Sequence, residues 1–251
     1  MGSTDETLAG DLARAAGRLL LTLRDGGLLG GRALGDIGDA VSQRMLAAAL
    51  AGHRPDDAVL SEEARDDPSR LDHERVWIID PLDGTREYGE EREDWAVHVA
   101  LTLGGAPGPS AVAIPARNQL FVGTPGARGT DGPAARRPEL PIRIAVSRSR
   151  PPAQAERVAT ALTAELVPIG SAGVKTMAVL TGEVDAYVHA GGQYEWDSAA
   201  PVGVALAAGL HASRIDGSPL VYNRRDPMLP DLLVCRAELA ETLLTALAVP
   251  A

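Results

Sequence analysis

The stretch that most constrains the fold of this chain is residues 76–88, which read VWIIDPLDGTREY. Its four leading apolar residues predict a short strand buried on both faces of a sheet. Because proline is poorly tolerated inside a central strand, the strand is expected to end at Pro81, and the Asp-Gly pair that follows favours a tight turn. The carboxylates of Asp80 and Asp83 would then lie at the rim of the sheet, beside the hydroxyl of Thr85. Such a pair suits a hard divalent cation, although the same residues also form turns that only face solvent.

Acidic residues in two further segments weaken the interpretation of Asp80 and Asp83 as a turn that only faces solvent. Glu62 and Glu63 follow a predicted strand over residues 58–60, and Asp197 lies at the N-terminus of a predicted helix over residues 199–208. Taken singly, these residues are an ordinary exposed acidic pair and an ordinary helix N-cap. Taken together, they place carboxylates at the ends of three separate elements.

These three segments resemble the magnesium-dependent, lithium-sensitive phosphomonoesterases that include inositol monophosphatase. The signature of that family is a Glu-Glu pair, then WIIDPxDGT, then a Trp-Asp pair with small residues far downstream. All three parts stand here in that order, and the resemblance extends over nearly the whole chain. Within the family, the stretches DPLDGTREY and GSAGVKTMAV are most similar to the CysQ-type 3'-phosphoadenosine 5'-phosphate (PAP) phosphatases.

The resemblance implies an α/β (α+β) protein with the layered αβαβα fold of the sugar phosphatases. We expect an antiparallel sheet in the first half and a mixed sheet in the second. Residues 124–141 are rich in Gly, Pro and Arg and have almost no large apolar side chain, which is typical of a linker or surface loop. We therefore divide the chain into residues 1–140, with the Glu-Glu and DPLDGT motifs, and residues 141–251, with the Trp-Asp motif and the substrate loops.

The resemblance also implies two or three Mg²⁺ ions, inhibition by Li⁺, and a set of metal ligands. Those ligands are Glu62, Asp80, Asp83, Asp197 and the main-chain carbonyl of Leu82, with Glu63 as a supporting neighbour. Asp39 and Thr85 would orient the attacking water. Asp39 is also the predicted N-cap of a helix over residues 40–51, which we expect to follow a glycine-rich loop over residues 30–38. The family's Thr-rich approach to Asp39 is missing, so Asp36 is a rival.

Substrate contacts are expected at several backbone turns. The backbone N–H groups of Gly84 and Thr85 would hold the phosphate, together with Asp197. Ser147 and Arg150 belong to a basic, hydroxyl-rich loop after a predicted strand, which can cup a phosphate. Ser171 and Lys175 flank a glycine-rich turn into a helix, where free N–H groups attract anions, although a closely packed turn explains the glycines equally well.

The charge and cysteine content restrict the partners and the compartment. With 24 Lys and Arg against 34 Asp and Glu, the net charge of -10 argues against nucleic-acid binding. The single cysteine excludes an intrachain disulfide and fits the reducing cytoplasm. We find no signal peptide, and no stretch approaches the roughly 18 apolar residues of a membrane span. We expect a small phosphorylated substrate, no membrane partner, and a monomer or homodimer.

The expected function is hydrolysis of the 3'-phosphate of adenosine 3',5'-bisphosphate (PAP), which gives AMP. Inositol monophosphate or fructose 1,6-bisphosphate are the alternative substrates within this fold. A binding protein that holds metal without turnover is an alternative of a different class, favoured only by the incomplete match around Asp39. A glycosidase with paired carboxylates is less favoured, because Asp80 and Asp83 lie on one turn and would approach a substrate from the same side.

Overall fold

The computed structural model describes residues 4–127 and 141–248 of the 251-residue chain. The helices are α1 (Asp5–Asp25), α2 (Gly31–His53), α3 (Thr85–Gly89), α4 (Ala153–Leu162), α5 (Ala172–Thr181), α6 (Glu195–Ala207) and α7 (Ala240–Leu247). The strands are β1 (Ala58–Ser61), β2 (Arg75–Asp83), β3 (Ala96–Leu103), β4 (Ala106–Ile114), β5 (Gln119–Gly123), β6 (Arg143–Ser147), β7 (Glu165–Ile169), β8 (Ala186–Tyr194), β9 (His211–Ser213) and β10 (Met228–Cys235). Short 3-10 helices cover Pro68–Asp72 (η1), Pro115–Arg117 (η2) and Ala237–Leu239 (η3).

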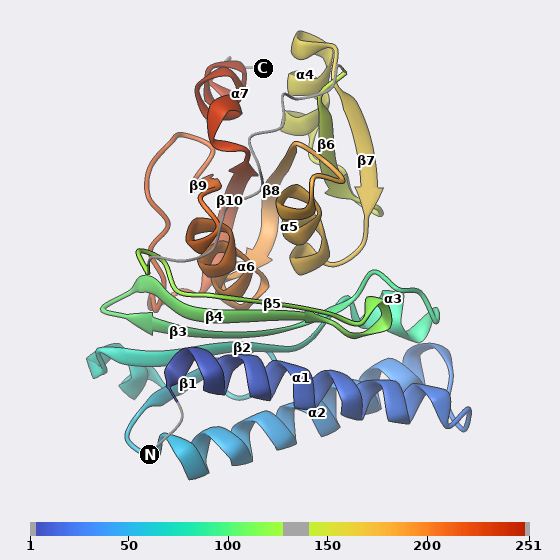
Figure 1. The fold of residues 1–251 in the computed structure, drawn as a ribbon, viewed down its shortest axis with the longest axis vertical. Helices are drawn as coiled ribbons and strands as arrows, with labels where there is room; N and C mark the ends of the chain where they lie inside the picture. The colour runs from blue at the N-terminus through green and yellow to red at the C-terminus, as the bar shows by residue number, and fades with distance from the viewer. Residues whose placement is uncertain (1–3, 128–140, 249–251) are drawn as a thin grey trace.

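The elements stack in alternating layers of helices and sheets (Figure 1). Helices α1 and α2 cover one face of the sheet built from β1 to β5. Helices α5 and α6 lie between that sheet and the sheet built from β6 to β10, whose far face is covered by α4 and α7. The predicted αβαβα layering is therefore confirmed.

The first sheet has the strand order β1-β2-β3-β4-β5. In β2, Trp77 and Ile79 pack with α1 and α2, whereas Val76 and Ile78 pack with α5 and α6, so this strand is buried on both faces as its apolar run predicts. The expectation of an antiparallel sheet is wrong for one pair, because β1 runs parallel to β2. The segment between them, which includes η1, crosses back so that both strands point toward the same edge.

The second sheet, in the order β7-β6-β8-β10-β9, is mixed as predicted. Strand β6 pairs in parallel with β7 and β8, while β10 pairs antiparallel with β8 and β9. Parallel strands end at a common edge, and here the turn after β7 reaches the end of β2. The two sheets therefore meet where the acidic residues of the sequence motifs lie.

Helix α2 differs from the prediction at its start. It begins at Gly31, so Asp39 lies within the helix and is not its N-cap. The glycines that suggested a loop serve close packing, because an added methyl group at Gly35 would lie 2.7 Å from the Thr85 side chain and one at Gly38 would lie 2.9 Å from Tyr88. Periodicity and glycine content could not separate these two uses of glycine.

Strand β2 also runs further than predicted. It continues through Pro81 to Asp83 with a shift in its register against β3 between Asp80 and Asp83. A bulge of this kind tolerates proline, because one residue leaves the regular ladder.

The predicted linker lies largely outside the described residues. The division of the chain between residues 140 and 141 stays a prediction. One hydrophobic core cluster contains residues from both sheets, so the two halves share part of their core. Among the described helices, none has the length and apolar character needed to cross a membrane.

Candidate metal centre and active site

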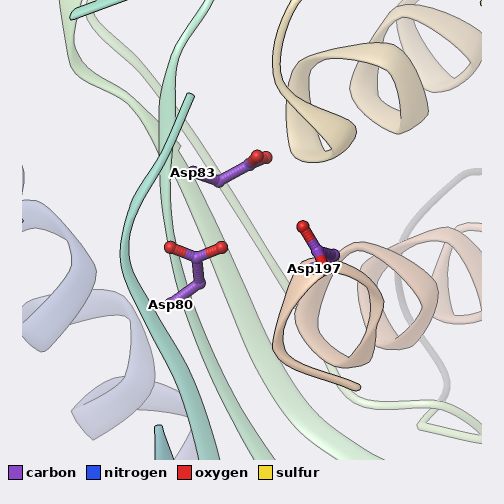
Figure 2. A group of neighbouring side chains, drawn as sticks. All are labelled: Asp80, Asp83 and Asp197. Atoms are coloured by element: carbon purple, nitrogen blue, oxygen red, sulfur yellow. The ribbon is translucent and has the colours of Figure 1, made fainter. Parts of the chain in front are cut away.

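Three carboxylates converge between the two sheets. Asp80 and Asp83 extend from β2, and Asp197 faces them from the first turn of α6 (Figure 2). One carboxylate oxygen from each lies within 4.8 Å of the other two. The structure thus brings together three of the residues expected to hold metal, while their role as ligands stays a prediction.

The end of β2 aims two of these carboxylates to one side. In a regular strand, residues three apart point to opposite faces, and the bulge after Asp80 removes that alternation. Asp80 Oδ1 accepts a hydrogen bond from the Leu82 N–H at 3.0 Å, and Ser42 on α2 donates to the Pro81 carbonyl at 2.8 Å. The carbonyl of Leu82, another expected ligand, lies within this same tight segment.

Asp83 is held from the opposite sheet. Its Oδ2 accepts hydrogen bonds from the Ser171 hydroxyl and, at 2.7 Å, from the Gly173 N–H. His98 Nε2 lies 3.2 Å from the same oxygen. Burial alone would raise the pKa of Asp83, but the adjacent His98, followed by the charge of Lys175, lowers it to about 2. Asp83 therefore stays ionised.

His98 connects Asp83 to the helix that carries Asp197. It is fully buried on β3, and its Nδ1 lies 3.1 Å from the Trp196 carbonyl oxygen. His98 is thus a hydrogen-bonded histidine within the sheet, and its contact with Asp83 was not anticipated from the sequence. No local sequence pattern marks it, because the Trp196 partner is 98 residues away.

The carboxyl groups of Asp80, Asp197 and the neighbouring Glu62 are harder to ionise. Burial, followed by the nearby charge of Glu62, raises the pKa of Asp80 well above its usual range. Burial and the charge of Asp83 raise the pKa of Asp197 to about 6. Glu62 is exposed as a whole residue, yet the protein around its carboxyl group and the charge of Asp197 raise its pKa to about 8.

This donor set fits a hard divalent cation. All the candidate ligand atoms are oxygens, and the raised pKa values reflect first their burial and then their mutual repulsion, both of which a bound cation would offset. Glu63 is exposed, and its charge contributes to the raised pKa values of Glu62 and Asp39, which puts it beside the cluster.

Asp39 and Thr85 form a hydrogen-bonded pair beside the cluster. The Thr85 hydroxyl lies 3.0 Å from Asp39 Oδ2 and 3.1 Å from the Leu82 carbonyl oxygen. Burial raises the pKa of Asp39 to about 7, against the lowering effect of the Thr85 hydrogen bond. Within the part of the chain that the structure describes, the buried Asp39 Oδ1 has no hydrogen-bond partner.

Asp36, the rival of Asp39, pairs with Arg32 rather than with Thr85. It is exposed and lies 3.5 Å from Arg32 Nε, although it lines a surface pocket that also includes Thr85. The geometry thus favours Asp39 as the partner of Thr85.

The expected substrate residues lie on several separate turns. Gly84 adopts φ +91° just before Thr85, and Ser147 accepts a hydrogen bond from the Arg150 N–H at the exposed end of β6. The Ser171 hydroxyl donates to Asp83 Oδ2, and its contact with substrate stays a prediction. Lys175 is buried and its ammonium donates to the carbonyls of Gly170 and Ser171, while burial lowers its pKa.

The layered fold and the acidic cluster at the meeting of its sheets define a class of metal-dependent phosphatases. Residues 33–248 match the inositol monophosphatase family, and the chain belongs to that family.

Two similar proteins are phosphatases that act on nucleotides, according to their names. The chain is 54% identical to the 3'-phosphoadenosine 5'-phosphate phosphatase of Mycobacterium leprae, over 96% of this chain and 92% of that protein. It is 29% identical to the 3'(2'),5'-bisphosphate nucleotidase CysQ of Escherichia coli K12, over 87% of this chain and 94% of that protein.

Solved structures share the fold. CysQ from Bacteroides thetaiotaomicron superposes with a TM-score of 0.78 at 24% identity, covering 93% of this chain and 97% of that one. Inositol monophosphatase II from Staphylococcus aureus superposes with a TM-score of 0.80 at 20% identity, covering 94% of this chain and 90% of that one.

Proposed function

We propose that this protein is a magnesium-dependent phosphomonoesterase that removes the 3'-phosphate of adenosine 3',5'-bisphosphate and releases AMP. The observation that carries the proposal is the Asp80, Asp83 and Asp197 cluster in a chain 54% identical to a 3'-phosphoadenosine 5'-phosphate phosphatase. A single cysteine, buried in the core, suits action in the cytoplasm.

The three aspartates, with Glu62 and the Leu82 carbonyl, are the residues that would hold Mg²⁺. When bound, the cation supplies positive charge to the phosphate oxygens and lowers the pKa of a bound water. Asp83 is the ligand best prepared for this role, because its pKa of about 2 keeps it ionised and three groups fix its orientation.

Asp39 and Thr85 would position the attacking water. The Thr85 hydroxyl fixes one oxygen of the Asp39 carboxylate, which leaves Oδ1 to accept a hydrogen bond from water. As the water oxygen attacks phosphorus, Asp39 takes its proton. The bond from phosphorus to the 3'-oxygen breaks, and that oxygen leaves with the bonding electrons and takes a proton from solvent to become the 3'-hydroxyl of AMP. A pKa of about 7 lets Asp39 give up and take a proton near neutral pH.

No covalent intermediate is needed in this scheme. The one cysteine is buried in β10, and burial raises its pKa to about 12, which disfavours the thiolate needed for a nucleophile. Lithium inhibition and the number of ions bound are further parts of the proposal.

The test is phosphate release from adenosine 3',5'-bisphosphate, inositol 1-phosphate and fructose 1,6-bisphosphate, each with Mg²⁺, with EDTA, and with Mg²⁺ plus Li⁺. We expect the largest kcat/KM for the nucleotide, loss of activity with EDTA, and inhibition by Li⁺. Comparable kcat/KM values for all three compounds would contradict the substrate assignment. No release from any of them would contradict hydrolysis and favour a metal-binding protein without turnover.

A further inference from the structure

A buried arginine joins two loops that are far apart in the sequence. Arg70 in η1 is 1% exposed and pairs with Asp66 through Nε at 2.6 Å and Nη2 at 3.1 Å. Its Nη1 donates to Asn223 Oδ1 at 2.7 Å, and its Nη2 donates to the Arg224 carbonyl at 2.9 Å. Asn223 Nδ2 donates back to the Arg70 carbonyl at 3.0 Å.

The second loop is joined in turn to the first turn of α6. The buried carboxylate of Glu195 accepts the Asn223 N–H at 2.7 Å and the Arg224 N–H at 2.8 Å. The Glu195 N–H donates to the Pro227 carbonyl at 2.8 Å. Glu195 is the first residue of α6, two positions before Asp197.

These contacts join the segment that follows Glu62 to the helix that carries Asp197. Arg70 belongs to the segment that leaves β1 directly after Glu62, whereas Glu195 belongs to the helix that carries Asp197. Every guanidinium nitrogen of Arg70 is used, and a planar guanidinium fixes direction as well as distance. A buried ionic group of this kind adds little net stability compared with apolar packing, which points to a positional role.

We propose that Arg70 is a positioning residue for the metal centre. Through Asn223, Arg224 and Glu195, it holds the Glu62 segment and the first turn of α6 in one fixed relation, so that Glu62 and Asp197 can bind the same ion cluster. This inference rests on the proposed function, because it assumes that both carboxylates are ligands.

The sharpest test is Asn223→Gly. Asn223 has φ +57°, a conformation that glycine adopts readily, so the substitution removes both side-chain bonds to Arg70 without straining the backbone. Asn118→Gly is the matched control, because Asn118 is an exposed asparagine with φ +51° in the turn between η2 and β5. The measurement is Mn²⁺ binding to the metal-free protein by titration calorimetry, with the melting temperature Tm of each variant recorded.

We expect Asn223→Gly to weaken Mn²⁺ binding by about tenfold, the lower end of the effect of groups that orient metal ligands, and Asn118→Gly to leave it unchanged. Arg70→Lys keeps the charge but loses the planar fork, so it should weaken binding as well. Arg75→Lys is its control, since Arg75 makes a two-point pair with Asp57 that does not lead to α6.

Unchanged Mn²⁺ affinity in folded Asn223→Gly, or equal weakening in the controls, would overturn the positioning role while leaving the proposed function intact. An unaltered protein that does not bind Mn²⁺ would overturn the proposed function, and this inference with it.

Discussion

At the scale of single residues, neighbouring carboxylates have different protonation because their partners differ. Asp83 receives two hydrogen bonds and lies beside His98, and its pKa is about 2. Asp39 has only the Thr85 hydroxyl to offset its burial, and its pKa is about 7. One group is therefore prepared to hold a cation, and the other to exchange a proton.

Substitution of Asp39 tests this division. We expect Asp39→Asn to lower kcat by about 10²–10⁴, the usual contribution of a positioned general base, with Mn²⁺ affinity close to that of the unaltered protein. The exposed Asp36→Asn should keep a near-normal kcat. The measurement is the steady-state kcat of both variants at saturating Mg²⁺. A larger loss of kcat in Asp36→Asn than in Asp39→Asn would mean that Asp36 orients the attacking water.

At the scale of elements, the sequence predicted which residues lie close together within one segment, but not the contacts between segments that are far apart in the sequence. Asp80 and Asp83 could be paired from the DPLDGT motif, because three residues separate them. The contacts of Asp83 with Ser171 and Gly173 span 88 and 90 residues, and no periodicity encodes them. The early start of α2 was missed because glycines that allow close packing look like glycines of a loop.

Helix α5 provides a test of such long-range packing. A methyl group added at Gly173 would lie 2.1 Å from His98 Nε2, so Gly173→Ala must push the histidine away from Asp83 or displace the helix. We expect a loss of about 1–3 kcal/mol in the free energy of unfolding. Gly52→Ala is the control in α2, where the methyl group meets nothing within 4 Å and should stabilise by up to about 1 kcal/mol. Equal urea midpoints for the two variants would refute the tight contact.

At the scale of the whole molecule, the site forms where two sheets and the helices between them meet. The αβαβα layering could be predicted because the resemblance extended over nearly the whole chain. The individual contacts that hold the layers together could not, since they join residues far apart in the sequence, as those of His98 and Arg70 do. Because the acidic groups at this meeting point have raised pKa values, we expect the free energy of unfolding of the whole protein to depend on pH and on bound metal.

This sensitivity has a definite sign. The pKa values are raised to about 6 for Asp197, about 7 for Asp39 and about 8 for Glu62. At any pH between the ordinary pKa of such a group and its raised pKa, the folded chain therefore binds more protons than the unfolded chain. Their contribution to stability is lost as pH rises through that range. The lowered pKa of His189, about 4, acts in the opposite direction, mainly below pH 6.5.

Binding of Mg²⁺ should restore the stability that the protein loses as the pH rises. Because Mg²⁺ competes with protons for the same oxygens, we expect it to raise Tm more at about pH 8 than at about pH 6. Scanning calorimetry of the metal-free protein with and without Mg²⁺ measures this difference. An equal rise in Tm at both pH values would mean that the ion does not bind these carboxylates.

The most direct test of the central claim is to identify the product formed from adenosine 3',5'-bisphosphate by phosphorus NMR, with the unaltered protein and with Asp83→Asn. The account predicts AMP that retains its 5'-phosphate, one equivalent of inorganic phosphate, and no detectable turnover by a folded Asp83→Asn. Loss of the 5'-phosphate, or near-normal turnover in Asp83→Asn, would contradict it.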